Sequence, residues 1–120
     1  MAVRRIVIVN NERGLVSSIR LALEHAGFEV ETFARGIDAL EPLRANPPAL
    51  ILLDQTNTPM GTEFFAQLNE TWIAPVIFVT PHAEEVQRIL GRRGTPAADY
   101  IPSPFSLHDL VQRVTNVVVP

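Results

Sequence analysis

The residues best suited to chemistry in this chain are polar side chains that follow short hydrophobic runs. Five of them are Asn10, Asn11, Asp54, Thr80 and Ser103. Only Asp54 carries a charge, while the others offer amide or hydroxyl groups that donate and accept hydrogen bonds. If they meet, one carboxylate among neutral groups makes a weak divalent-cation site at most, because such cations rely on carboxylate ligands. No metal site other than this weak one is expected.

The hydrophobic pattern predicts strands and helices in alternation, which implies a parallel sheet with helices on both faces. At this length we expect an α/β fold, a doubly wound five-stranded parallel sheet of order 2-1-3-4-5, flavodoxin-like, in a three-layer sandwich. Gly27 is expected to close the first helix, and Pro42 to kink or shorten the second. The expected strands are 3–9, 28–33, 49–53, 75–79 and 98–101, and the expected helices are 15–26, 37–43, a short one near 64–68, 84–93 and 107–118.

Such a sheet explains why the polar residues matter together. In an open α/β sheet, ligands bind at the carboxyl ends of the strands, beside the point where the strand order reverses. Each of the five polar residues follows a predicted strand, so the fold prediction brings them to one crevice. No pairing of a nucleophile with a base supports a catalytic reaction elsewhere, and we expect no enzyme activity.

Composition limits the alternatives. The chain has 120 residues, 47% of them hydrophobic and 19% charged, which predicts one globular domain over 1–120. The net charge of −3 argues against direct nucleic-acid binding. The absence of cysteine excludes disulfides and thiolate metal sites. The apolar runs are too short to span a membrane and no secretion signal is evident, so a cytoplasmic location is expected.

Four segments resemble the signature segments of response-regulator receiver domains, the phosphoacceptor domains of two-component systems. The resemblance covers essentially the whole chain and is strongest to receivers that precede winged-helix DNA-binding domains. It implies that Asp54 is the phosphoacceptor position for a histidine kinase, and that Thr80 and Tyr100 are switch positions. The four segments are 6–12, 50–54, 75–80 and 98–105.

The site departs from the receiver pattern. Asn10 and Asn11 stand where the resemblance calls for two Mg²⁺-binding acids, and Ser103 stands where it calls for a lysine. Pro81 replaces a small residue whose N–H would face the phosphoryl group, and proline has no N–H. These departures predict a pseudo-receiver with a degenerate pocket and no tightly bound cofactor. Asparagine also suits strand-to-helix turns, and its amide could bond Asp54 directly.

Two functions follow as leading hypotheses. The first is signalling by protein–protein interaction, with a histidine kinase or an output domain as partner, or as a homodimer. The dimer would use the last two helices and the fifth strand, where Asp99 and Arg113 match positions of cross-dimer ion pairs in related receivers. The alternative is a working receiver phosphorylated at Asp54, as the N-terminal part of a DNA-binding regulator. A flavin-binding domain is disfavoured because the 10–14 loop lacks a phosphate-cradling composition.

Overall fold

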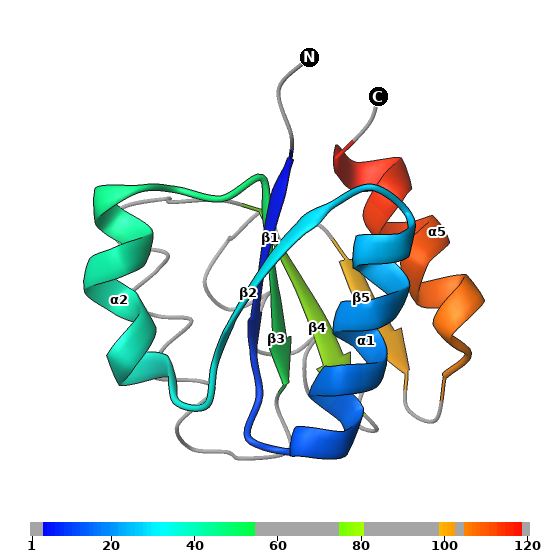
Figure 1. The fold of residues 1–120 in the computed structure, drawn as a ribbon, viewed down its shortest axis with the longest axis horizontal. Coiled ribbons are helices and arrows are strands. Elements are labelled where there is room, and N and C mark those ends of the chain that lie inside the picture. The colour runs from blue at the N-terminus through cyan, green and yellow to red at the C-terminus, as the bar shows by residue number, and fades with distance from the viewer. Residues whose placement is uncertain (1–3, 55–74, 81–98, 103–104, 119–120) are drawn as a thin grey trace.

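The computed structural model describes residues 4–54, 75–80, 99–102 and 105–118. Their strands form a five-stranded, all-parallel sheet in the order β2-β1-β3-β4-β5, as predicted (Figure 1). Described helices separate the first three strands and a further helix follows the last strand, so the predicted α/β fold class is confirmed. The strands are β1 (Arg5–Val9), β2 (Glu29–Phe33), β3 (Leu50–Asp54), β4 (Val76–Thr80) and β5 (Asp99–Pro102).

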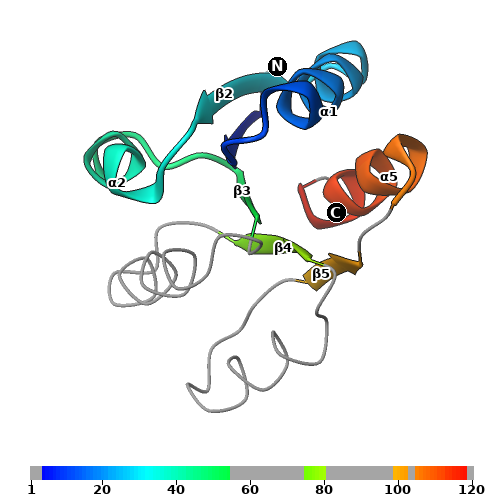
Figure 2. The same ribbon diagram turned by 90° about the horizontal axis from the view of Figure 1, so that it is seen from below.

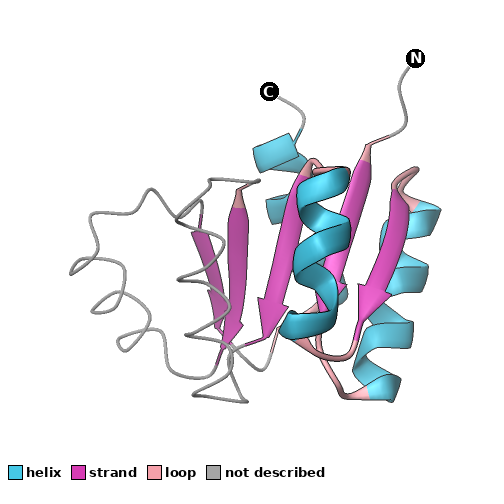
Figure 3. Cartoon of the chain, turned by 90° about the vertical axis from the view of Figure 1, so that its left-hand side faces the viewer, coloured by secondary structure: helices cyan, strands magenta, loops and turns pink. Residues whose placement is uncertain are grey.

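The described helices cover both faces of the sheet (Figures 2 and 3). Helices α1 (Arg13–His25) and α5 (Leu107–Val118) lie side by side on one face, and α2 (Gly36–Ala45) lies on the other. The helices expected near 64–68 and over 84–93 fall outside the described residues.

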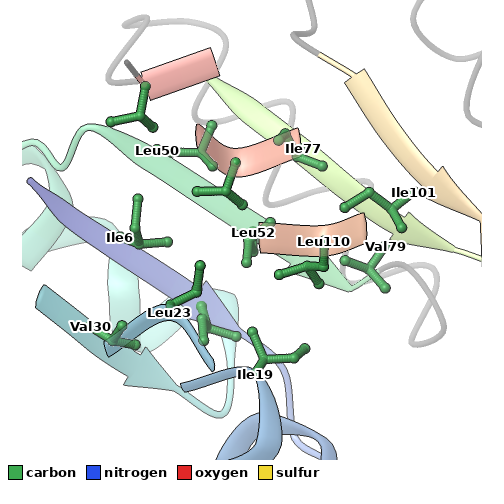
Figure 4. Packing of buried hydrophobic residues seen from close by; sticks show 13 residues of the cluster. Ile6, Ile19, Leu23, Val30, Leu50, Leu52, Ile77, Val79, Ile101 and Leu110 are labelled. Carbon is green, nitrogen blue, oxygen red and sulfur yellow. The ribbon is translucent and has the colours of Figure 1, made fainter. Parts of the chain in front are cut away.

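The core lies between the sheet and the α1–α5 layer. The runs that predicted two-faced burial are enclosed: every residue of Ile6–Val9 and of Leu50–Leu53 is at most 5% exposed. Figure 4 shows side chains of β1, β3 and β4 meeting those of α1 and α5. Burial of this kind is the dominant favourable contribution to folding. The labelled residues are Ile6, Ile19, Leu23, Val30, Leu50, Leu52, Ile77, Val79, Ile101 and Leu110.

Helix α1 ends as its sequence predicts. Gly27 has φ +101°, and its N–H donates to the carbonyl of Glu24 at 3.0 Å. The N–H of Phe28 donates to the carbonyl of Leu23, also at 3.0 Å. This pair of bonds is a Schellman motif, which satisfies carbonyls that the helix end would leave unpaired and requires a left-handed residue.

Replacing Gly27 by alanine is expected to destabilise the fold by about 1–2 kcal/mol, because an L side chain disfavours positive φ. The cost is conformational, since an added Cβ would meet nothing within 4 Å. Gly14, within α1, also has open space around an added Cβ. Gly14→Ala should therefore stabilise the protein, by a few tenths to ~1 kcal/mol. Urea unfolding of both variants measures the difference, and two changes of the same sign would contradict it.

Two details differ from the sequence expectation. Helix α2 is not shortened at Pro42 but continues to Ala45, and the N–H of Asn46 donates to the Pro42 carbonyl at 3.0 Å. Pro42 and Asp38, four residues earlier, are both exposed, so water can satisfy the carbonyl that the missing N–H leaves free. The apolar spacing of the last helix predicts Leu107 on the same face as Leu110 and Val114, but Leu107 is 38% exposed because it begins the helix at the rim of the core.

Two arginines at the amino edge of the sheet tie separate segments together. Arg4 donates through its guanidinium to the carbonyl of Val118 in α5, which links the beginning of β1 to the end of the last helix. Arg5 forms an ion pair with Glu31 of β2 and donates to the carbonyl of Asn46 after α2.

Within the ranges described above, no helix is long and apolar enough to cross a membrane.

Candidate functional site

Strand register brings the ends of four strands to one edge of the sheet. Val9 lies opposite Leu53 in the β1–β3 pair, so Asn10 and Asp54 follow neighbouring positions. Asp54 in turn lies opposite Val79. Strand β1 lies between β2 and β3, so the strand order reverses beside β1, at the carboxyl ends of β1 and β3. In α/β sheets this is the position where ligands bind.

Farther along the same edge, Thr80 is paired with Pro102 of β5. The backbones of Asp54, Thr80 and Tyr100 therefore occupy the strand positions expected of them. Their side chains lie outside the described part of the structure. Ser103 and Pro81 lie outside it altogether, so the roles suggested for them stay predictions.

Asn10, which directly follows β1, is a buried polar residue of the site. It is 7% exposed, and its Oδ1 accepts a hydrogen bond of 2.8 Å from the backbone N–H of Glu12. Its own N–H donates to the carbonyl of Phe33 at 3.0 Å, which ties the end of β1 to the end of β2. Glu12 is the N-cap residue of α1 and makes no capping bond through its side chain. Asn10 thus closes the strand-to-helix turn, as asparagine is suited to do.

Replacing Asn10 by alanine is expected to destabilise the fold by about 1 kcal/mol or somewhat more, because the N–H of Glu12 would lose its acceptor. Asn11 is exposed, so Asn11→Ala should change stability by less than ~0.5 kcal/mol. Thermal unfolding of the two variants compares adjacent residues of the same type. Equal losses would show that the turn does not depend on the Asn10 side chain.

The residues after β1 do not fit Mg²⁺. Asn10 offers a neutral oxygen that already accepts the Glu12 N–H, and Asn11 offers a neutral and exposed amide. Mg²⁺ holds its water tightly and exchanges it for carboxylates more readily than for neutral amides. Among the residues described above, no three His, Cys, Asp or Glu side chains lie together as metal ligands would. His25 and His108 are both exposed.

The structure also contains a pocket that the sequence did not predict. It has a volume of about 290 Å³ and lies between α1 and the carboxyl end of β2. Arg13 and Arg20 line it, and the signal for this was their spacing of seven residues, which places them on one helix face. The remaining lining residues are Asn10, Asn11, Val16, Ser17, Thr32, Phe33 and Ala34.

A neighbouring arginine is engaged elsewhere. The Nε of Arg35 donates to Asp38 at 3.0 Å, on the surface at the beginning of α2. This hydrogen bond, together with the negative charge of Asp38, raises the pKa of Arg35 above its ordinary value. Arg35 is thus paired with Asp38 and is not among the residues that line the pocket.

Comparison with known proteins identifies the family. Residues 6–115 match the response regulator receiver domain. The chain is 37% identical to the phosphate regulon transcriptional regulatory protein PhoB of Rhizobium meliloti (strain 1021), over 92% of this chain and 50% of that protein. It is 34% identical to the transcriptional regulatory protein CreB of Escherichia coli (strain K12), over 92% of this chain and 49% of that protein. The chain thus spans about half the length of these relatives.

Solved structures agree with this result. A CheY-like receiver domain protein from Methanospirillum hungatei JF-1 superposes with a TM-score of 0.84 at 27% identity, covering 98% of this chain and 94% of that one. Chemotaxis protein CheY4 of Vibrio cholerae, at 21% identity and a TM-score of 0.83, shares the fold over 97% of this chain and 99% of its own.

The chain therefore belongs to the response-regulator receiver family. It is a receiver domain of the two-component type, related to the receivers of DNA-binding regulators. Such domains are signalling modules rather than classical enzymes. They interact with histidine kinases and output domains, and they normally use Mg²⁺ for phosphorylation.

Proposed function

We propose that residues 1–120 form one receiver-like domain with a degenerate phosphoacceptor pocket, and that it signals mainly through protein contacts. The observation that supports this most directly is the state of Asn10. Its side chain is buried, and its oxygen accepts a hydrogen bond from the Glu12 N–H. Asn10 therefore stabilises the turn, at a position where an acidic residue would bind a metal ion. The proposed function is that of a pseudo-receiver.

The chemistry of phosphoryl transfer supports the same proposal. Such transfer depends chiefly on positioning and on neutralising the developing charge. In this chain amides replace the two acids after β1, and Ser103 replaces a lysine that would contact the phosphoryl oxygens. A charge-assisted contact of that kind contributes roughly 1.5–3 kcal/mol. Without these groups, Asp54 has little to stabilise a phosphoryl group beside it.

The second candidate is a working receiver phosphorylated at Asp54 by a histidine kinase. It is supported by the presence of Asp54 at the end of β3 and of Thr80 at the end of β4, on the same edge of the sheet. The longer relatives CreB and PhoB are named as transcriptional regulatory proteins, which is compatible with a DNA-binding output in a longer form of this protein.

Intact mass spectrometry after incubation with acetyl phosphate and Mg²⁺ separates the two candidates. We expect no adduct on the parent chain, and the same result for Asp54→Asn. A phosphoryl adduct on the parent chain that Asp54→Asn abolishes would refute the degenerate pocket and establish the second candidate. A receiver with a complete acid pair and lysine serves as the positive control for the donor.

The proposed contacts include a homodimer through the face of β5 and the last two helices. Asp99 in β5 and Arg113 in α5 are the residues proposed to pair across it, and the half-exposed Leu107 adds apolar surface at one end of α5. A cytoplasmic location and a protein partner, either a histidine kinase or an output domain, complete the proposal.

Sedimentation velocity with and without acetyl phosphate tests the dimer. We expect the same association in both conditions, because no phosphoryl group is needed to form the face. Arg113→Glu should weaken association, whereas Arg44→Glu, on the exposed end of α2, should leave it unchanged. Association that appears only with the phosphoryl donor would contradict the proposal.

A further inference from the structure

The pocket between α1 and β2 concentrates positive charge on an acidic protein. The whole chain has a net charge of −3, yet among the described residues two arginines and no acidic residue line this pocket. Arg13 and Arg20 reach it from the same face of α1, with Ser17 between them. Guanidinium groups bind phosphate oxygens with paired hydrogen bonds, and a dianion balances two such cations.

Several hydrogen-bond donors in the pocket have no acceptor among the described residues. Arg13 makes no ion pair with any of them, and Arg20 uses only its Nε, which lies 3.5 Å from Glu24. Asn10 lines the pocket and is 7% exposed. Its oxygen must face the Glu12 N–H, so its amide nitrogen is the free end, and within the described part of the chain that nitrogen has no acceptor. A buried donor without an acceptor is costly, which an anionic ligand would remedy.

The β2 side of the pocket is of a different character. Phe33 and Ala34 supply apolar surface there, and Thr32 adds a hydroxyl. Val16 adds apolar surface on α1, beside the arginines. The volume of about 290 Å³ exceeds what a bare phosphate needs and approaches the lower end of small-molecule sites, roughly 300 Å³. Cationic groups on one wall and an apolar ring contact on the other suit a phosphate joined to an organic body.

We propose that this pocket binds a small organic phosphomonoester of the mononucleotide type. Its phosphate would contact Arg13, Ser17 and Arg20, and its organic part would rest on Val16 and Phe33. The pocket shares Asn10 and Asn11 with the site after β1, and its ligand is proposed to bind whether or not Asp54 is phosphorylated. It gives the domain a ligand of its own, in addition to its protein partners.

NMR titration of the full chain with adenosine 5′-monophosphate tests the proposal, with adenosine as the uncharged control. We expect saturable shifts at millimolar concentration for amides in 10–20 and 32–34 with the nucleotide, and none with adenosine. No saturable shift with the nucleotide, or an equal response to adenosine, would overturn the proposal.

Variants sharpen the test. Arg13→Gln and Arg20→Gln should each weaken nucleotide binding about tenfold, the loss of one charge-assisted contact. Glu24→Gln should strengthen it about twofold, because Arg20 is released from a competing carboxylate. Arg44→Gln removes the same charge from an exposed position on α2 and should leave binding unchanged. If Arg44→Gln weakens binding as much as Arg13→Gln does, the interaction is general charge attraction and the site is refuted.

Discussion

Changing both Asn10 and Asn11 to aspartate is expected to raise the affinity for Mg²⁺ at least ~100-fold. Two carboxylates would join Asp54, which follows a neighbouring position on β3. At contact distance a unit charge is worth about 4 kcal/mol against another even at an effective dielectric constant near 20. An aspartate at position 10 keeps an oxygen for the Glu12 N–H, so the turn should survive.

The same double variant should become metal-dependent in its stability. Position 10 is 7% exposed, and a carboxylate placed there beside Asp54 loses hydration and meets a like charge. Without metal we expect a loss of about 1–3 kcal/mol, and Mg²⁺ should restore it. Calorimetric titration measures the affinity, and urea unfolding with and without Mg²⁺ measures the stability.

Asn116→Asp supplies the control, because it introduces one of the same charges at an exposed position of α5. It should alter neither the affinity for Mg²⁺ nor the response of stability to it. If the parent chain already binds Mg²⁺ as tightly as the double variant, the neutral pocket is not what limits metal binding, and the account of a degenerate site fails.

Leu23→Ala should destabilise the protein by about 3–4 kcal/mol. Leu23 is 0% exposed and belongs to the core between α1 and the sheet, so truncation leaves a cavity that the surrounding strands cannot fill. Leu21, two residues earlier in the same helix, is 69% exposed. Its replacement by alanine should change stability by less than ~0.5 kcal/mol.

Urea unfolding compares the two leucine variants with equal helix propensity and equal change in side-chain volume. The difference between them therefore reports burial alone. Similar losses for both would mean that the face of α1 turned to solvent carries as much packing energy as the buried face, which would contradict the packing described here.

The sequence predicted the fold closely because its strands are short runs of β-branched and aliphatic residues. Ile6–Val9 and Leu50–Leu53 could only be stable in a sheet covered on both faces, and both are buried. The sequence also predicted correctly that α1 ends at Gly27. Pro42 did not shorten the helix as one alternative of the prediction had it, because solvent can reach the carbonyl that the missing N–H leaves unpaired.

The site was harder to predict than the fold. The sequence indicated that Asn10 stands at a strand end, but its double role in closing the turn and lining the α1–β2 pocket depends on burial and on one hydrogen bond. The pocket itself is formed by α1 and β2 together, and no pattern within one segment reports a cavity between two. For Asp54, Thr80, Tyr100 and Ser103, the side-chain roles stay predictions.

The hydrogen bond from Arg4 to the carbonyl of Val118 determines where the ends of the described chain lie. It fastens the two ends of the described chain at the amino edge of the sheet, whereas Asn10 and Asp54 lie at the carboxyl edge. With strands of five residues, the two edges are separated by about 16 Å. The first and last described residues and the polar strand-end residues therefore lie on opposite edges of the sheet.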